Sequence, residues 1–279
     1  MTDLLAVHEV DRKFDPGGAA SGPRGGRVAL VHVYEISVPS VEQEIATEYF
    51  GSDVAGGKAM TGRLSNAWRL MWGFGAIVAG FLVDRFGARR LLAIYLLGCG
   101  AACVLAATST DESSLFMAMI VMGALASIYH PAGLSLISHE TTAENRPRAL
   151  GIHGIFGSAG ISVAPLMAGL LLAASFTWRQ VYWVLMIPGL VFVWQSFKHP
   201  AIESQCTGAS EDSDEQNHVD WVSFYTLTCM AAVQGFVYSA LMSFLPRYLS
   251  GAVDSFPSFL VDFLGMFGGN YLAAGDFGG

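Results

Sequence analysis

Long apolar runs separated by short polar stretches are the main feature of this chain, and they predict its elements. A helix needs about 20 mostly apolar residues to cross a hydrocarbon layer about 30 Å thick. The clearest runs of about that length lie at residues 60–83, 91–108, 115–138, 149–174, 181–197 and 221–245. A weaker, glycine-rich run at 258–274 predicts one more span. The pattern therefore predicts a chain of membrane-spanning helices.

The first candidate span, residues 28–50, is more polar than the others. His32, Glu35, Pro39 and Glu42 follow one another at spacings of 3, 4 and 3, which places them on one stripe of a helix. The remaining surface carries Val31, Val33, Ile36, Val38, Val41 and Ile45. We expect this helix to turn its polar stripe toward the interior of a bundle while lipid covers the rest.

Composition and charge agree with a membrane protein and exclude several other classes. The chain is 53% hydrophobic and 14% charged, whereas a soluble domain has about 25% charged residues. A net charge of −8 without a basic tract does not suggest nucleic-acid binding. The sequence contains no phosphate-binding glycine loop, no His-Glu-x-x-His and no Gly-x-Ser-x-Gly motif. We therefore predict no enzyme, no cofactor and no metal site.

The distribution of basic residues predicts the orientation in the membrane. With the N-terminus in the cytoplasm, the outer side carries Lys58, Arg63, Arg179 and Arg247, and Arg69 lies within the membrane. The cytoplasmic side carries Arg12, Lys13, Arg24, Arg27, Arg85, Arg89, Arg90, Arg146, Arg148 and Lys198. Because cytoplasmic loops are rich in Lys and Arg, this orientation is favoured. We expect an integral protein of a bacterial inner membrane.

The spans and polar segments divide the chain into four parts. Residues 1–27 are charged and rich in Gly and Pro, and predict a disordered cytoplasmic tail. Residues 28–197 hold six spans, and the acidic residues 198–220 predict a flexible cytoplasmic linker. Residues 221–279 hold one or two further spans, with an outer loop expected at 246–257.

A charged turn between the second and third spans gives the strongest local signal. It contains Gly80, Leu82, Asp84, Arg85, Gly87, Arg89 and Arg90. Gly80 and Gly87 suit a sharp reversal with close approach of two helices. These residues resemble the signature between the second and third helices of major facilitator superfamily transporters. The resemblance implies a cytoplasmic gating latch in which Asp84 docks against a neighbouring helix terminus. The alternative is a charged turn that only orients two helices.

The fifth span carries a second match. Gly160, Ala164, Pro165, Ala168 and Gly169 are similar to the antiporter motif of the same superfamily, with Ala in place of Gly at two positions. Small residues at these spacings let helix backbones approach closely, and Pro165 is expected to bend the helix. Generic packing of small residues is the alternative interpretation.

A third similarity points to the fosmidomycin-resistance-like efflux branch of the superfamily. It rests on residues 129–133, Tyr-His-Pro-Ala-Gly, and on residues 146–153, which end at His153. The arginine that many drug/proton antiporters carry in the fourth helix is missing, because residues 117–122 are apolar. That departure puts proton coupling through such an arginine in doubt.

Charged and titratable residues inside the spans are the candidates for function. Glu35 of the first span and Arg69 of the second are expected at similar depths, where antiparallel neighbours can pair. Glu35 is either a proton-binding carboxylate or one member of a static ion pair. His130 either lines a cavity or is a satisfied interior histidine, and His153 is expected at the membrane interface.

Members of the superfamily that this chain resembles have twelve helices in two six-helix halves. The resemblance therefore implies an all-α membrane protein with a six-helix major-facilitator-type bundle and about two further transmembrane helices, truncated relative to a twelve-helix transporter. It implies secondary transport by alternating access, with proton-coupled efflux of a small organic molecule as the expected activity. The alternative is a non-transporting remnant, or a subunit that needs a homodimer or a second-half partner.

Overall fold

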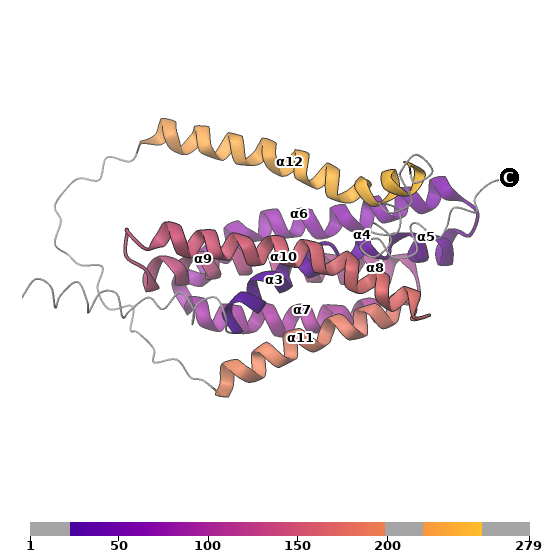
Figure 1. The fold of residues 1–279 in the computed structure, drawn as a ribbon, viewed down its shortest axis with the longest axis horizontal. Helices are drawn as coiled ribbons and strands as arrows, with labels where there is room; N and C mark the ends of the chain where they lie inside the picture. Colours follow the sequence, from indigo (N-terminus) through magenta and orange to yellow (C-terminus); the bar gives the residue numbers. More distant parts are fainter. Residues whose placement is uncertain (1–22, 199–219, 253–279) are drawn as a thin grey trace, which may run out of the picture.

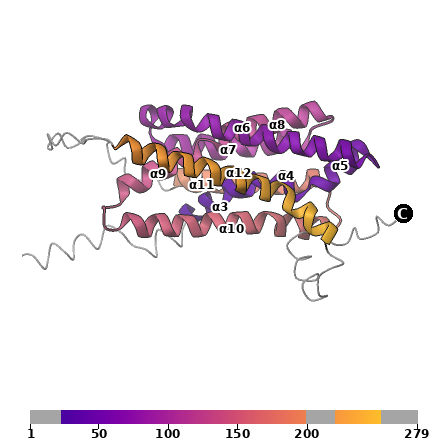
Figure 2. The same ribbon diagram turned by 90° about the horizontal axis from the view of Figure 1, so that it is seen from above.

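The computed structural model describes residues 23–198 and 220–252, and these residues form helices and turns without a strand (Figure 1). The helices are α3 (Pro23–Glu35), α4 (Ser37–Ser40), α5 (Glu42–Phe50), α6 (Val54–Phe86), α7 (Ala88–Ala107), α8 (Glu112–Ala126), α9 (Tyr129–Glu140), α10 (Arg146–Ala173), α11 (Trp178–Lys198) and α12 (Trp221–Ala252). The long helices run along one axis of an elongated bundle, with α12 on one side (Figures 1 and 2). The predicted all-α fold is confirmed.

Several helices have the length and composition of membrane spans. Five described segments qualify, namely α6, α7, the α8–α9 segment Glu112–Glu140, α10, and residues Trp221–Met242 of α12. The outward-facing side of α6 is apolar: Phe74, Ile77 and Phe81 are 67%, 67% and 74% exposed. Side chains of this kind are stable against lipid tails, so the bundle is that of an integral membrane protein.

The first predicted span is divided into three short helices, α3, α4 and α5. Pro39 has no N–H to donate to the carbonyl of Glu35, and its ring crowds that carbonyl, so the helix breaks at Ile36. Ser37 Oγ donates to the Tyr34 carbonyl at 2.7 Å, and Ser40 Oγ donates to the Ile36 carbonyl at 2.7 Å. These two hydroxyls donate hydrogen bonds to backbone carbonyls at the break.

The expectation that lipid covers most of the first span is wrong. Its apolar side chains are buried on every side: Val31, Val41 and Ile45 are 0% exposed, and Val33, Ile36 and Val38 are 7% exposed or less. Helix α3 contacts α8, α9, α10 and α11, and α4 contacts α6, α10 and α12. The first segment therefore lies in the centre of the bundle.

The fourth predicted span is also interrupted, between α8 and α9. Pro131 cannot donate to the carbonyl of Ser127, four residues earlier, and the break falls at Ser127 and Ile128. As in the first segment, a proline ends one helix and starts another within a predicted span. This break places His130 in the first turn of α9.

Some predicted boundaries are shifted. Helix α3 begins at Pro23, inside the predicted tail, and α12 continues to Ala252, so the outer loop expected at 246–257 is wrong over its first part. The rest of that loop and the span expected at 258–274 lie outside the described residues. The predicted tail up to residue 22 and the linker from residue 199 to 219 also lie outside them.

The end of the bundle opposite the α6–α7 turn is tied together by one arginine. Arg179 of α11 donates to Glu48 Oε2 at 2.5 Å and to the Ser109 carbonyl at 2.9 Å, and its guanidinium lies 4.2 Å from the centre of the Trp178 ring. Trp178 Nε1 also donates to Glu48 Oε2, at 2.6 Å. Helices α5 and α11 and the turn before α8 are thereby joined.

Candidate functional site

A buried carboxylate marks the centre of the candidate site. Glu35 is the last residue of α3, and its side chain is 1% exposed. His32, one turn earlier, brings Nδ1 within 2.8 Å of Glu35 Oε2. The other carboxylate oxygen, Oε1, is buried and accepts no hydrogen bond from the described residues. A buried acceptor without a partner is costly, so this atom is suited to bind a proton or a ligand group.

Arg69 and Tyr238 approach Glu35 from two other helices. Arg69 of α6 lies close enough to Glu35 for their charges to interact, and Tyr238 of α12 interacts electrostatically with both residues. Arg69 and Tyr238 are each partly buried, although α12 is otherwise exposed over most of its described length. The structure thus brings together Glu35 and Arg69 and adds a hydroxyl from the helix that follows the linker.

Three histidines gather beside the carboxylate. The His32 ring centre is 5.7 Å from that of His130 of α9, which is in turn 6.4 Å from that of His153 of α10. All three side chains are partly buried. Helix α10 packs against α3 and carries His153 into this cluster, and the expected position of His153 at the membrane interface stays a prediction. We refer to His32, His130 and His153 as the histidine trio.

Aromatic rings surround the histidine trio. The Trp72 ring centre lies 5.4 Å from that of His130, and the Tyr129 ring is stacked on that of His153 at 5.9 Å. Such rings hold the imidazoles by edge and face contacts. Within the described residues, no group of three or more His, Cys, Asp or Glu side chains is arranged to hold a metal ion.

Sequence reasoning missed three members of the site: His32 as a functional residue, His153, and Tyr238. The i,i+3 spacing of His32 and Glu35 is a signal that could have found the first. No comparable signal exists for His153 or Tyr238, since their positions depend on how α10 and α12 pack against the centre.

The predicted charged turn is present, but its residues contact only their own end of the bundle. Gly87 alone separates α6 from α7 and has φ of +85°, a conformation that favours glycine. Arg89 Nη2 lies 3.3 Å from Glu140 Oε1 at the end of α9, while Arg85 lies 5.8 Å from the centre of the Phe86 ring. Asp84 and Arg90 are exposed at the same turn.

Two details of the charged turn differ from expectation. A Cβ added to Gly80 would meet no atom within 4 Å, so the close helix approach expected there is wrong in the described structure. Asp84 makes no hydrogen bond or ion pair with any residue that the structure describes. Its role as a docking residue of a gate stays a prediction.

The antiporter-like segment of α10 packs closely against the centre. A Cβ placed on Gly160 would lie 2.8 Å from the carbonyl carbon of Ala29 in α3, so no side chain fits there without displacement. Gly169 is buried, and Pro165 lies within α10 and removes one hydrogen bond of that helix. The motif therefore sets the contact between α10 and α3.

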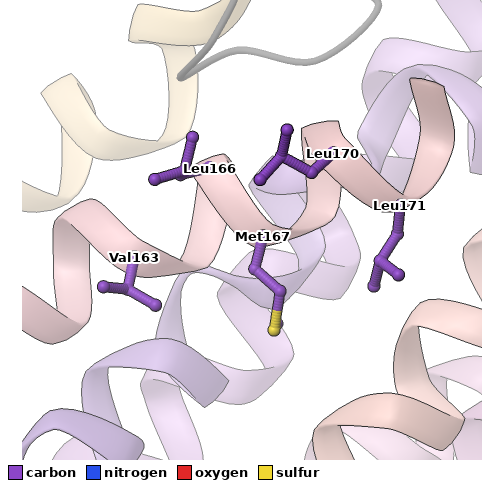
Figure 3. Close-up of a pocket in the computed structure, with 5 residues that line it drawn as sticks. All are labelled: Val163, Leu166, Met167, Leu170 and Leu171. Atoms are coloured by element: carbon purple, nitrogen blue, oxygen red, sulfur yellow. The ribbon is translucent and has the colours of Figure 1, made fainter. Parts of the chain in front are cut away.

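The outer side of α10 bears a separate apolar pocket of about 290 Å³. Figure 3 shows its lining side chains, which are Val163, Leu166, Met167, Leu170 and Leu171. None of the candidate residues lies in it. Its composition suits contact with an acyl chain or an apolar side chain, and it offers no group for chemistry.

Interrupted helices that surround buried charged side chains in a membrane bundle are a feature of secondary transporters. The sequence profile of the Major Facilitator Superfamily matches residues 34–275, and the chain belongs to this family. The match includes Glu35, Arg69, the charged turn and the histidines at 130 and 153. The activity of relatives still applies to this chain only as a proposal.

The chain is similar to resistance and efflux proteins of actinobacteria. It is 32% identical over 153 residues to the puromycin resistance protein pur8 of Streptomyces alboniger, a match that covers 54% of this chain and 28% of that protein. It is 34% identical over 119 residues to the multidrug efflux pump LfrA of Mycolicibacterium smegmatis, a match that covers 41% of this chain and 23% of that protein. These matches therefore span less than a third of each relative.

Solved transporters share the fold. The inward-open xylose transporter XylE from E. coli has a TM-score of 0.54 at 16% identity, covering 62% of this chain and 46% of that one. A peptide transporter POT has a TM-score of 0.54 at 14% identity, and the match covers 92% of this chain and 54% of that one. At these identities the likeness supports the fold alone. Assignment to the fosmidomycin-resistance-like branch stays a prediction.

Proposed function

We propose that this chain provides the first half, and the start of the second half, of a secondary transporter that exports a small organic molecule in exchange for protons. The resistance and efflux relatives support export as the direction. The alternative, a non-transporting remnant or a subunit dependent on a partner, receives no support from the comparisons.

The observation that carries this proposal is the buried Glu35 carboxylate, which Arg69 and Tyr238 approach from two other helices. An ionised carboxylate near the middle of a bilayer costs a few kcal/mol unless it is paired, hydrated or neutralised. Arg69 offsets part of this cost when Glu35 is ionised. A bound proton removes the charge altogether. Glu35 thus has a neighbouring charge that stabilises its ionised form and a buried site that favours its neutral form, and a coupling residue needs both.

Alternating access supplies the link between the proton and the substrate. In transporters of this architecture, the two halves rock about a site near the bilayer midplane. Tyr238 belongs to the second half and interacts with Glu35 and Arg69 of the first half. Protonation of Glu35 changes the charge that faces Tyr238, and the contact between the halves then differs between the two proton states. A substrate that displaces the proton favours the other arrangement of the halves.

Transport in reconstituted vesicles tests the proposal. Proteoliposomes with an acidic interior should accumulate puromycin as protons leave, and Glu35→Gln should abolish this accumulation. The matched control is Glu112→Gln, because the Glu112 side chain is 38% exposed and pairs with Arg63 at the end of the bundle. Accumulation that persists in Glu35→Gln would exclude Glu35 as the coupling residue. Absence of pH-driven accumulation in the inserted wild-type chain would refute the proposal as it applies to puromycin.

A further inference from the structure

We propose that the histidine trio is a proton relay that connects Glu35 with the end of the bundle at which the α6–α7 turn lies. This inference rests on the proposed function and deepens it, because it names the route by which a proton moves between Glu35 and that end of the bundle. No sequence motif of the family assigned a role to His32 or His153.

The order of the three rings along the bundle supports a route. His153 lies seven residues after the start of α10, about 10 Å along that helix, whereas His130 lies ten residues before Glu140, about 15 Å along α9. Glu140 contacts Arg89, so both helices have these ends beside the α6–α7 turn. His153 is therefore nearer to that end than His130, and His32 contacts Glu35 directly.

Each separation in the series suits proton transfer. His32 Nδ1 and Glu35 Oε2 are 2.8 Å apart, which is a direct hydrogen bond. The ring centres of His32 and His130 are 5.7 Å apart, and those of His130 and His153 are 6.4 Å apart. One water molecule between neighbouring rings bridges such distances. An imidazole can accept a proton at one nitrogen and donate another from the second, which a phenol or amide does less readily at neutral pH.

The relay step is balanced in protons and charge. A hydronium ion from the aqueous side gives its proton to His153 and becomes water, and His153 then releases the proton on its other nitrogen toward His130. His130 does the same toward His32, and His32 gives the proton on Nδ1 to Glu35 Oε2. The carboxylate becomes a neutral carboxyl group, and all three imidazoles end neutral with their tautomers exchanged. The same steps in reverse carry a proton from Glu35 to that end of the bundle, while in the other arrangement of the halves Glu35 exchanges its proton with the opposite side.

The charged surroundings favour Glu35 as the end of the relay. The titratable groups that face the histidine trio or its ring neighbours are Glu35 on α3, Arg69 on α6, Tyr95 on α7, Tyr129 on α9, Tyr238 on α12 and, across the centre of the bundle, Tyr182 on α11. Among these described groups, Glu35 is the carboxylate. An added proton therefore removes a charge at Glu35, whereas on a histidine it would add a positive charge at a partly buried position.

The test measures two kinds of transport in the same vesicles. In His130→Gln and His153→Gln, we expect pH-driven puromycin accumulation to fall by about a hundredfold, the scale of a lost proton-transfer group. Exchange of labelled for unlabelled puromycin at equal pH needs no net proton movement, and it should stay near the wild-type rate. The control is His139→Gln, because His139 is exposed on α9 outside the trio, and neither activity should change.

The outcomes separate the relay from packing and from failure of the proposed function. Unchanged pH-driven accumulation in both variants would overturn the relay, and an equal loss of accumulation and exchange would show that the histidines act only in packing. If Glu35→Gln retains accumulation, the proposed function fails instead.

Discussion

Replacing Gly160 by Val tests whether the contact between α10 and α3 sets the stability of the bundle. The added Cβ would lie 2.8 Å from the Ala29 carbonyl carbon and 2.9 Å from its Cα. Carbon atoms in contact are normally about 3.5–4.0 Å apart, so the two helices must separate by about 0.7–1.2 Å. Overpacking of this kind costs about 1–3 kcal/mol. Because Val and Gly differ by less than about 0.5 kcal/mol in helix propensity, we expect most of this cost to appear as lost stability.

Gly151→Val is the matched control in the same helix. A Cβ on Gly151 would meet no atom within 4 Å, and the residue is exposed, so we expect a change within about 0.5 kcal/mol. Thermal unfolding can be followed with a thiol-reactive dye, because Cys99 and Cys103 are 0% exposed in the folded bundle. The exposed Cys229 and the linker residue Cys206 are first changed to Ser. Equal melting temperatures for the two glycine variants would refute the packing argument.

Two further predictions concern the end of the bundle opposite the α6–α7 turn. Arg179→Ala removes the donor shared by Glu48 and the Ser109 carbonyl and should lower the free energy of unfolding by about 1–3 kcal/mol. Arg63→Ala breaks an exposed ion pair with Glu112 and should lower it by about 0–1 kcal/mol. Chemical unfolding in micelles compares the two variants, and equal losses would contradict the predicted difference. The Ser114 backbone N–H donates a hydrogen bond to Asp111 and lowers the pKa of that carboxyl. Asp111 therefore stabilises the start of α8 fully at pH values above its ordinary pKa of about 3.9. This stabilisation is lost as the pH falls through the lowered pKa. Hydrogen exchange at pH 6 should show a less protected Ser114 amide in Asp111→Ala than in the wild type. Equal protection in the variant and the wild type would contradict the role of Asp111 as the N-cap of α8.

Hydropathy predicted the long helices because each of them is apolar over the length of a bilayer. The turn at Gly87 was predicted for a similar reason, since its charges and glycine are local features of the sequence. The two helix breaks were not predicted, although Pro39 and Pro131 are local signals for them, because a proline affects the carbonyl four residues earlier wherever the helix lies. These parts of the fold depend on neighbours in the chain.

The composition of the site could not be predicted in the same way. His32, His130 and His153 come from three helices, and only packing brings them together. The valines of the first segment have the same hydropathy whether lipid or protein covers them, so the sequence does not distinguish the two environments. Glu35 and Arg69 were identified because a charge inside a span is costly wherever it lies.

The central position of the first segment determines when it can reach its final environment during synthesis. Tyr34 donates to the carbonyl of Leu185, 151 residues later, and Ser37 contacts Tyr182, 145 residues later. At a ribosomal rate of about 5–20 residues per second, these partners emerge roughly 7–30 seconds after the first segment. The segment that bears Glu35 can therefore reach its buried position only after these later neighbours have been synthesised.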